Sequence, residues 1–515
     1  MKRLVALLVL FTFLRICLFG QETVDTSVIR RITTEALHHS KVMDNAFYLS
    51  DVFGPRLTGS PGFAAAAEWA EKRLKEYGLV NIQREPFPWG RGWSAEGFRA
   101  ELTAPQYAPL IGYPLPWSTS TKGLVKGEPV LAPFPQYSNW SEESFQEYFA
   151  TYKGKLKGKI ILLESPRHSK LEHRHPTKRY TDEELEALSK QWIHDDPASG
   201  NKQDAKKPFE YFADLLIRFY NAEGAALLVF LEWGNGGGVM QLSHAFGANW
   251  LHFPKYELPP PMIGLCFEHY NRIARLLNHR IPVQLGIEVK TRIEPTAATF
   301  NLTAEITGTD KADEIVMIGG HLDSWTAGTG ATDNAAGVSV MMEAVRILKT
   351  LDLKPRRTIR IALWGGHEGE GTGARTYVNN HFGNRKKPKP EYNKISAYFN
   401  LDNGTGRIRG IYANENEQIV HVFKKWFEPF ASLGASVVSI NKMTGTDHVR
   451  FEEAGIPGFQ FIQDPIEYNE LTHHTNMDLY DHLKEADLKQ ASAIIASFAY
   501  LAATREELLP RKPVK

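Results

Sequence analysis

The regular alternation of short apolar runs with helical segments after about residue 300 is the feature that most constrains the fold of this chain. Four runs have the length and apolar character of buried strands: residues 314–319, 358–364, 396–401 and 457–462. Residues 337–351 repeat apolar side chains at helical spacing, and residues 486–503 form a closing helical segment. Strands that alternate with helices predict a layered α/β fold with a largely parallel sheet.

The length of the chain, 515 residues, exceeds what one compact core usually supports, so we expect two domains. Between about residues 123 and 297 the pattern changes. Two short apolar runs, residues 157–163 and 225–230, lie on either side of a charged stretch. We expect this segment to be a separately packed insert that contributes no metal ligand.

The charged stretch covers about residues 166–207. Thr181-Asp-Glu-Glu184 is a capping box and predicts a helix through Trp192. Three histidines also lie in this stretch: His168, His173 and His175. Its composition favours a solvated basic loop over a metal site, so we interpret the stretch as a surface excursion.

The first residues have the order of a secretory signal peptide. Met1-Lys2-Arg3 is basic, and residues 4–14 are almost wholly apolar. Arg15 interrupts the apolar run, which is too short to span a bilayer comfortably. We therefore expect residues 1–20 to be removed on export, so that the mature protein is secreted or periplasmic and has no stable membrane span. Only Cys266 would then remain, which excludes an intrachain disulfide.

The charge balance gives no support for a polyanionic partner. The chain has 60 basic and 59 acidic residues and a formal net charge of +1. A nucleic-acid or anionic-membrane partner is therefore not expected.

Side chains suited to metal binding follow the predicted strands. The five residues are His321, Asp333, Glu368, Asp402 and His474. In open α/β sheets, ligands bind outside the carboxyl ends of the strands, so these residues are expected to converge. Two imidazoles and three carboxylates suit zinc, and a shared carboxylate would hold two ions about 3.5–4 Å apart. Singly, each has an ordinary alternative as a polar loop residue or helix cap; the argument depends on the set.

Asp323, two residues after His321, is expected to orient the His321 side chain. On an extended segment, residues two apart point to the same side. Asp323 can therefore accept a hydrogen bond from His321 and select its tautomer.

Several motifs together resemble the co-catalytic zinc exopeptidases, which include secreted bacterial aminopeptidases and carboxypeptidase Q. Five segments carry the resemblance: Gly319-Gly-His-Leu-Asp-Ser-Trp325, Ala331-Thr-Asp-Asn-Ala-Ala-Gly337, Leu363-Trp-Gly-Gly-His-Glu368, Asn400-Leu-Asp-Asn403 and Thr472-His-His-Thr-Asn-Met-Asp478. Gly54-Pro-Arg-Leu-Thr-Gly-Ser60 is similar to the family's N-terminal entry. The resemblance covers most of the mature chain.

The resemblance implies a three-layer α/β sandwich with a mostly parallel mixed sheet and an inserted β-rich protease-associated domain. The implied organisation is a signal peptide at 1–20, peptidase parts at 21–122 and 298–515, and the insert at 123–297.

The resemblance also implies a role for each site residue. Asp333 would bridge two zinc ions, His321 and Asp402 would complete one site, and Glu368 and His474 would complete the other. Asp323 would orient His321. Thr446-Asp-His448 resembles a segment that lines the substrate pocket, which implies that Asp447 and His448 bind substrate.

One position departs from the family. His367 stands where the family has the glutamate that acts as general base. A neutral imidazole can accept a proton, so His367 is one candidate for the base. Glu370 is a second candidate, and a binding protein with little or no hydrolytic activity is the third possibility.

We therefore expect a secreted di-zinc metallo-exopeptidase that hydrolyses dipeptides or the terminal residues of short peptides. The alternative is a catalytically weak or silent homologue that binds metal and peptide. A related hydrolase acting on another amide is also compatible with the motifs. The sequence does not indicate which peptide terminus is recognised, the native metal or the oligomeric state.

Overall fold

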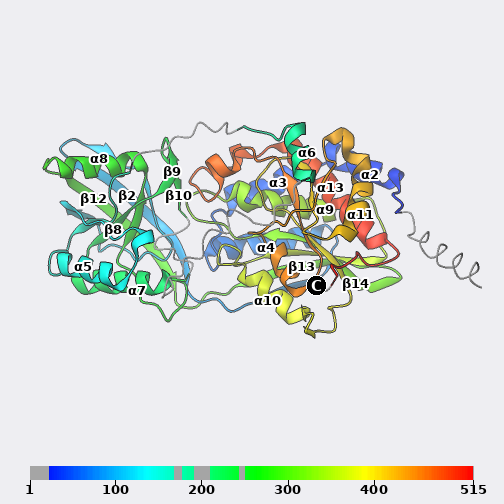
Figure 1. Ribbon diagram of the computed structural model, residues 1–515, viewed down its shortest axis with the longest axis horizontal. Coiled ribbons are helices and arrows are strands. Elements are labelled where there is room, and N and C mark those ends of the chain that lie inside the picture. Colours follow the sequence, from blue (N-terminus) through cyan, green and yellow to red (C-terminus); the bar gives the residue numbers. More distant parts are fainter. Residues whose placement is uncertain (1–21, 168–176, 191–208, 243–249, 514–515) are drawn as a thin grey trace, which may run out of the picture.

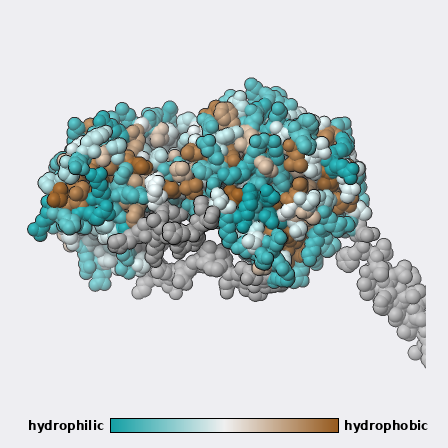
Figure 2. Space-filling view, turned by 90° about the horizontal axis from the view of Figure 1, so that it is seen from above, coloured by the Kyte–Doolittle hydropathy of each residue, from teal (hydrophilic) through white to brown (hydrophobic). Residues whose placement is uncertain are grey.

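The computed structural model describes residues 22–167, 177–190, 209–242 and 250–513, which form a large and a small lobe (Figure 1). The expected signal peptide lies outside these ranges, as do three histidines of the charged stretch: His168, His173 and His175. No helix within the described ranges is both long enough and apolar enough to cross a membrane. On the face seen in Figure 2, hydrophilic residues dominate and hydrophobic ones are scattered, as is usual for a protein surface.

The large lobe is built on an eight-stranded mixed sheet. In spatial order its strands are β1 (Val80–Pro86), β13 (Phe300–Ile306), β15 (Arg357–Trp364), β14 (Lys311–His321), β18 (Ile395–Asn400), β21 (Gly458–Gln463), β19 (Ile408–Tyr412) and β20 (Val437–Ser439). Strands β15, β14, β18 and β21 are parallel to one another, whereas β1, β13 and β19 join their inner neighbours antiparallel. The expected α/β fold with a mostly parallel mixed sheet is confirmed.

Helices cover both faces of this sheet because successive strand residues point to opposite sides. Val316 and Ile318 of β14 pack into a core with α9 (Ala336–Thr350), α13 (Glu485–Thr504) and α2 (Thr26–His38). The alternate residue Met317 packs instead with α10 (Thr372–His381) and α12 (His448–Ala454). A parallel sheet buried on both faces needs nearly continuous apolar strands, which explains the apolar runs in the sequence.

The small lobe contains two further sheets. One has the order β4 (Gly112–Pro114), β11 (Met262–Leu265), β8 (Leu227–Leu231), β7 (Ile160–Leu162), β6 (Pro129–Leu131). The other has the order β3 (Ala108–Pro109), β2 (Gly92–Ala104), β12 (Gln284–Glu294), β5 (Val125–Gly127). Helices α5 (Glu142–Tyr152), α7 (Phe209–Glu223) and α8 (Phe267–Asn278) pack on these strands, so the lobe is mixed α/β rather than mainly β.

The sheet pairing bears on where the insert begins. Strand β2 pairs with β12 from Gly92–Glu294 to Ala104–Gln284, and β4 pairs with β11, although both β2 and β4 precede residue 123. We therefore propose that the insert begins near Gly92 instead of near Gly123. Among the described residues, no strand between 123 and 297 joins the eight-stranded sheet.

The described part of the charged stretch packs against the large lobe. Its helix α6 (Asp182–Lys190) begins with the expected capping box, because Thr181 N donates to Glu184 and Glu184 N donates to the Thr181 hydroxyl. Leu185 packs against Val437 of the edge strand β20. The described part of the excursion therefore covers an edge of the central sheet (Figure 1).

Candidate metal centre

The parallel strands bring the five candidate ligands to one edge of the central sheet. His321 is the last residue of β14, Glu368 follows β15, and Asp402 follows β18. Asp333 lies in the turn over Ala331–Ala335 that leads into α9, and His474 lies in the loop after β21. Because β15, β14, β18 and β21 are neighbours that run in one direction, their carboxyl ends meet.

The two oxygens of Asp333 face different histidines. His321 Nε2 lies 3.1 Å from Asp333 Oδ1 and 3.0 Å from Asp402 Oδ1. His474 Nε2 lies 3.2 Å from Asp333 Oδ2 and 3.4 Å from Glu368 Oε2. The side chains therefore form two groups that share Asp333, which is the arrangement required of a carboxylate that bridges two cations.

The acidic side chains of this cluster are short of hydrogen-bond donors. Asp333 Oδ2 and Glu368 Oε1 are buried and accept no hydrogen bond. Burial and the nearby Asp333 charge raise the pKa of Glu368 well above its ordinary value. Burying carboxylates without donors is costly, and a cation between them would remove that cost. The mixture of imidazole nitrogen and carboxylate oxygen fits zinc.

Asp323 supports the site through more contacts than the sequence predicted. His321 Nδ1 lies 3.0 Å from the Asp323 backbone carbonyl oxygen and 3.6 Å from its Oδ1 atom, which leaves His321 Nε2 facing the cluster. The Asp323 carboxylate also accepts hydrogen bonds from the backbone N–H groups of His367 and Glu368 and from the Thr58 hydroxyl, at 3.3, 3.2 and 2.6 Å. Asp323 thus fixes a histidine and the neighbouring loop together.

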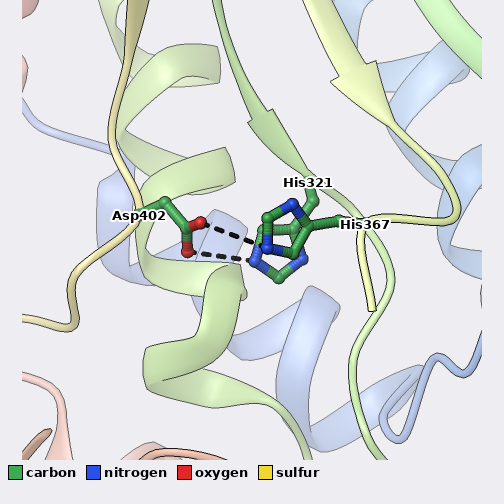
Figure 3. Close-up of side chains that lie close together, drawn as sticks. All are labelled: His321, His367 and Asp402. Atoms are coloured by element: carbon green, nitrogen blue, oxygen red, sulfur yellow. Dashed lines mark hydrogen bonds and ion pairs between the residues drawn. The ribbon is translucent and has the colours of Figure 1, made fainter. Parts of the chain in front are cut away.

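His367 projects into the cluster beside His321 (Figure 3). The two imidazole rings stack with their centroids 4.0 Å apart and their planes 14° apart. His367 Nδ1 lies 3.0 Å from Asp447 Oδ2, and Nε2 lies 3.5 Å from Asp402 Oδ2. Burial and His321 lower the pKa of His367, but Asp447 and Asp402 outweigh them and hold it above its ordinary value.

The two residues implied to bind substrate point to different places. Asp447 lines a small cavity of about 110 Å³ together with His367, and its Oδ1 atom is buried without a hydrogen-bond partner. His448, the first residue of α12, is fully buried; its Nδ1 atom lies 2.6 Å from the Thr446 hydroxyl, and burial lowers its pKa to about 4. The other candidate base, Glu370, is exposed beside the same small cavity.

Sequence reasoning missed two residues that hold the ligand loops. The Asp478 carboxylate accepts hydrogen bonds from the backbone N–H groups of Thr332 and Asp333, at 2.6 and 3.2 Å. Burial and the nearby Asp333 raise the pKa of Asp478 to about 7. Arg56 is fully buried and donates to the carbonyl oxygens of four residues: Leu49, Leu322, Thr329 and Gly330. Both residues lie within motifs that carried the resemblance, which was the available signal.

His473 is a further residue near the cluster. Its Nε2 atom lies 3.9 Å from Asp333 Oδ2, and burial with the neighbouring His474 lowers its pKa to about 4. A neutral imidazole at this position is able to bind a metal ion or a polar substrate group.

Comparisons with known proteins agree with the geometry. Residues 301–499 match Peptidase family M28. Carboxypeptidase Q of Mus musculus is 25% identical over 476 residues, which cover 90% of this chain and 86% of that protein.

Two solved structures share the fold. The Peptidase M28 precursor from Shewanella amazonensis SB2B has a TM-score of 0.66 and 24% identity, and the match covers 95% of this chain and 99% of that one. BSAP, a zinc aminopeptidase from Bacillus subtilis, has a TM-score of 0.56 and 18% identity, with 90% and 95% of the two chains covered. Both matches extend over the two lobes.

Proposed function

We propose that this chain is a co-catalytic zinc exopeptidase that binds two zinc ions and hydrolyses dipeptides or the terminal residues of short peptides. The match to Peptidase family M28 at residues 301–499 and the similarity to carboxypeptidase Q support this proposal. The observation that carries the proposal is the position of Asp333, whose two carboxylate oxygens face His321 and His474 separately.

In this proposal each ligand has one role. His321 and Asp402 hold one ion, Glu368 and His474 hold the other, and Asp333 is shared. Bound zinc would polarise the carbonyl group of the substrate and lower the pKa of a bound water molecule. Asp323 keeps His321 Nε2 directed at its ion, and Asp478 and Arg56 hold the backbone around Asp333 and Leu322.

His367 is proposed to accept a proton at Nε2. Its Nδ1 atom is occupied by Asp447, so Nε2 is the nitrogen that faces the cluster. Asp447 acts as a positioning residue in this arrangement, because its contact is with the imidazole ring.

The experiment is an activity assay on protein with measured metal content. The mature protein, loaded with zinc or cobalt, is incubated with dipeptides, amino-acid anilides and carboxyl-terminally varied peptides. The proposal expects about two ions per chain, release of terminal residues and loss of both after chelation. Asp333→Ala should lower occupancy of both sites, whereas His474→Ala should mainly weaken one. Unchanged metal content in Asp333→Ala would contradict the bridging role.

A second candidate function is favoured by the position of His367. His321, His367 and Asp402 each offer a potential ligand atom, and the three atoms lie within 4.8 Å of one another. The Nδ1 atom of His367 is held by the Asp447 carboxylate, as in many metal-binding histidines. If His367 binds an ion, it no longer accepts a proton, and the protein is a weak or silent metal-binding homologue.

We also propose that the protein is exported. The basic start and apolar run of residues 1–20 support this localisation. N-terminal sequencing of the protein recovered outside the cytoplasm tests it: a start near Gln21 is expected, and an intact Met1 start would contradict it.

A further inference from the structure

The backbone of the proposed ligand His474 has an unusual conformation. Its φ angle is +60°, in the left-handed region that residues with a side chain rarely adopt. Such a conformation persists where the surrounding contacts determine it. The contacts of the 472–478 loop therefore decide whether His474 Nε2 points at Asp333 and Glu368.

The small lobe supplies these contacts through the hairpin of β9 (Trp233–Gly236) and β10 (Val239–Gln241), which lies between the lobes (Figure 1). The Leu242 N–H group donates to the carbonyl oxygen of His474 at 3.0 Å. Gln241 and Thr475 form an isolated antiparallel bridge. The hairpin thus pairs directly with the backbone that carries the ligand.

Asn476 joins the same hairpin with three hydrogen bonds. Its Oδ1 atom accepts from Met240 N–H at 2.8 Å, its Nδ2 atom donates to the Gly238 carbonyl at 3.1 Å, and its own N–H donates to the Met240 carbonyl at 3.1 Å. Both side-chain contacts are with backbone groups, so they fix the position of the hairpin relative to the loop.

The hairpin is itself firmly attached to the small lobe. Glu268 on α8 accepts a hydrogen bond from Gly237 N–H at 2.6 Å. Met240 and Leu242 are fully buried in the same apolar cluster as Trp325, whose ring centroid lies 6.0 Å from that of His474. A continuous set of contacts therefore runs from α8 to the ligand.

We propose that Asn476 is a positioning residue that couples the small lobe to the His474 metal site. By clamping the β9–β10 hairpin onto the loop, it maintains the left-handed backbone of His474 and so sets the affinity of the ion held by His474 and Glu368. The ion held by His321 and Asp402 is outside this coupling. The inference rests on the proposed two-metal function, and it adds that the affinity of one metal site depends on the small lobe.

The test is a zinc titration of the metal-free full-length mature protein against a chromophoric chelator. Asn476→Ala should weaken the second zinc about 10–100-fold, the usual effect of removing a partner that orients a ligand. The first zinc should bind as in the unchanged protein. Asn476→Asp keeps the acceptor for Met240 N–H and loses the donor to Gly238, so its effect should be smaller. His474→Ala identifies which site has weakened.

Asn271→Ala is the matched control. The Asn271 side chain also binds backbone with both amide atoms, but its partners are the N–H and carbonyl groups of Arg167, which belongs neither to the β9–β10 hairpin nor to the 472–478 loop. It should leave both zinc affinities unchanged, and amide hydrogen exchange in residues 472–478 should rise only in the Asn476 variants. If the unchanged protein binds fewer than two ions, the proposed function fails. If it binds two and folded Asn476→Ala and Asn476→Asp bind both equally well, only the coupling is overturned.

Discussion

At the scale of single residues, the role of His367 distinguishes a hydrolase from a weak or silent metal-binding homologue. If His367 Nε2 accepts the proton, His367→Ala should lower turnover about 10²–10⁴-fold with metal content unchanged. If His367 holds an ion instead, the unchanged protein should be slow and His367→Ala should lose metal. His367→Glu should then raise activity by restoring a carboxylate. Steady-state kinetics with metal analysis on each sample distinguishes the two.

Asp447 gives a second prediction at this scale. Burial lowers the pKa of His367, and the Asp447 charge, with that of Asp402, more than offsets it. Asp447→Asn keeps the shape of the side chain and removes its charge, so the pKa of His367 should fall. If His367 is the base, its neutral imidazole is the active form, so the acid limb of the pH–rate profile should move to lower pH. Glu453→Gln, on the exposed side of α12, should leave the limb in place. An unshifted limb in Asp447→Asn would argue against His367 as base.

At the scale of elements, α6 and the residues before it anchor the charged excursion to the central sheet. Arg179 lies 2.9 Å from Asp464 and 2.7 Å from Asp487, and both carboxylates are buried. Arg179→Ala would leave these carboxylates with Arg407, Arg409 and the backbone N–H group of Tyr180 as partners. We expect a loss of about 1–3 kcal/mol in the free energy of unfolding, measured with urea.

An exposed ion pair on the same helix provides the control. Lys190 pairs with Glu186, and both side chains are more than 60% exposed. Lys190→Ala should therefore change the free energy of unfolding by less than about 1 kcal/mol. Equal losses in Lys190→Ala and Arg179→Ala would show that the buried carboxylates do not depend on Arg179.

At the scale of the whole molecule, metal binding should stabilise the large lobe. The site gathers three buried acidic side chains, Asp333, Glu368 and Asp402, and a bound cation favours the folded state because the unfolded chain lacks the site. At 100 times the dissociation constant, one ion adds about 2.7 kcal/mol. Chelation should lower the melting temperature in calorimetry, and Asp333→Ala should abolish most of that shift. A melting curve unaffected by chelator would contradict a folded-state metal site.

The sequence by itself determined the local chemistry of the protein. Apolar runs long enough for strands and a helix with inward Val338, Met341 and Val345 were sufficient to predict the α/β sandwich, because period and burial are local properties. His321, Asp402 and the other candidate ligands follow apolar runs in the sequence. This was sufficient to predict that they converge, because the carboxyl ends of parallel strands lie at the same edge of a sheet.

Only the tertiary structure decided the relations between distant segments. The proposed start of the insert near Gly92 depends on which strand β2 pairs with, and strand patterns do not specify a partner. From the sequence, Asp447 and His448 had the same expected role in substrate binding, yet Asp447 contacts His367, whereas the buried His448 contacts Thr446. The contact between Asn476 and the hairpin joins residues more than two hundred positions apart, and it exists because the packing of the two lobes brings them together.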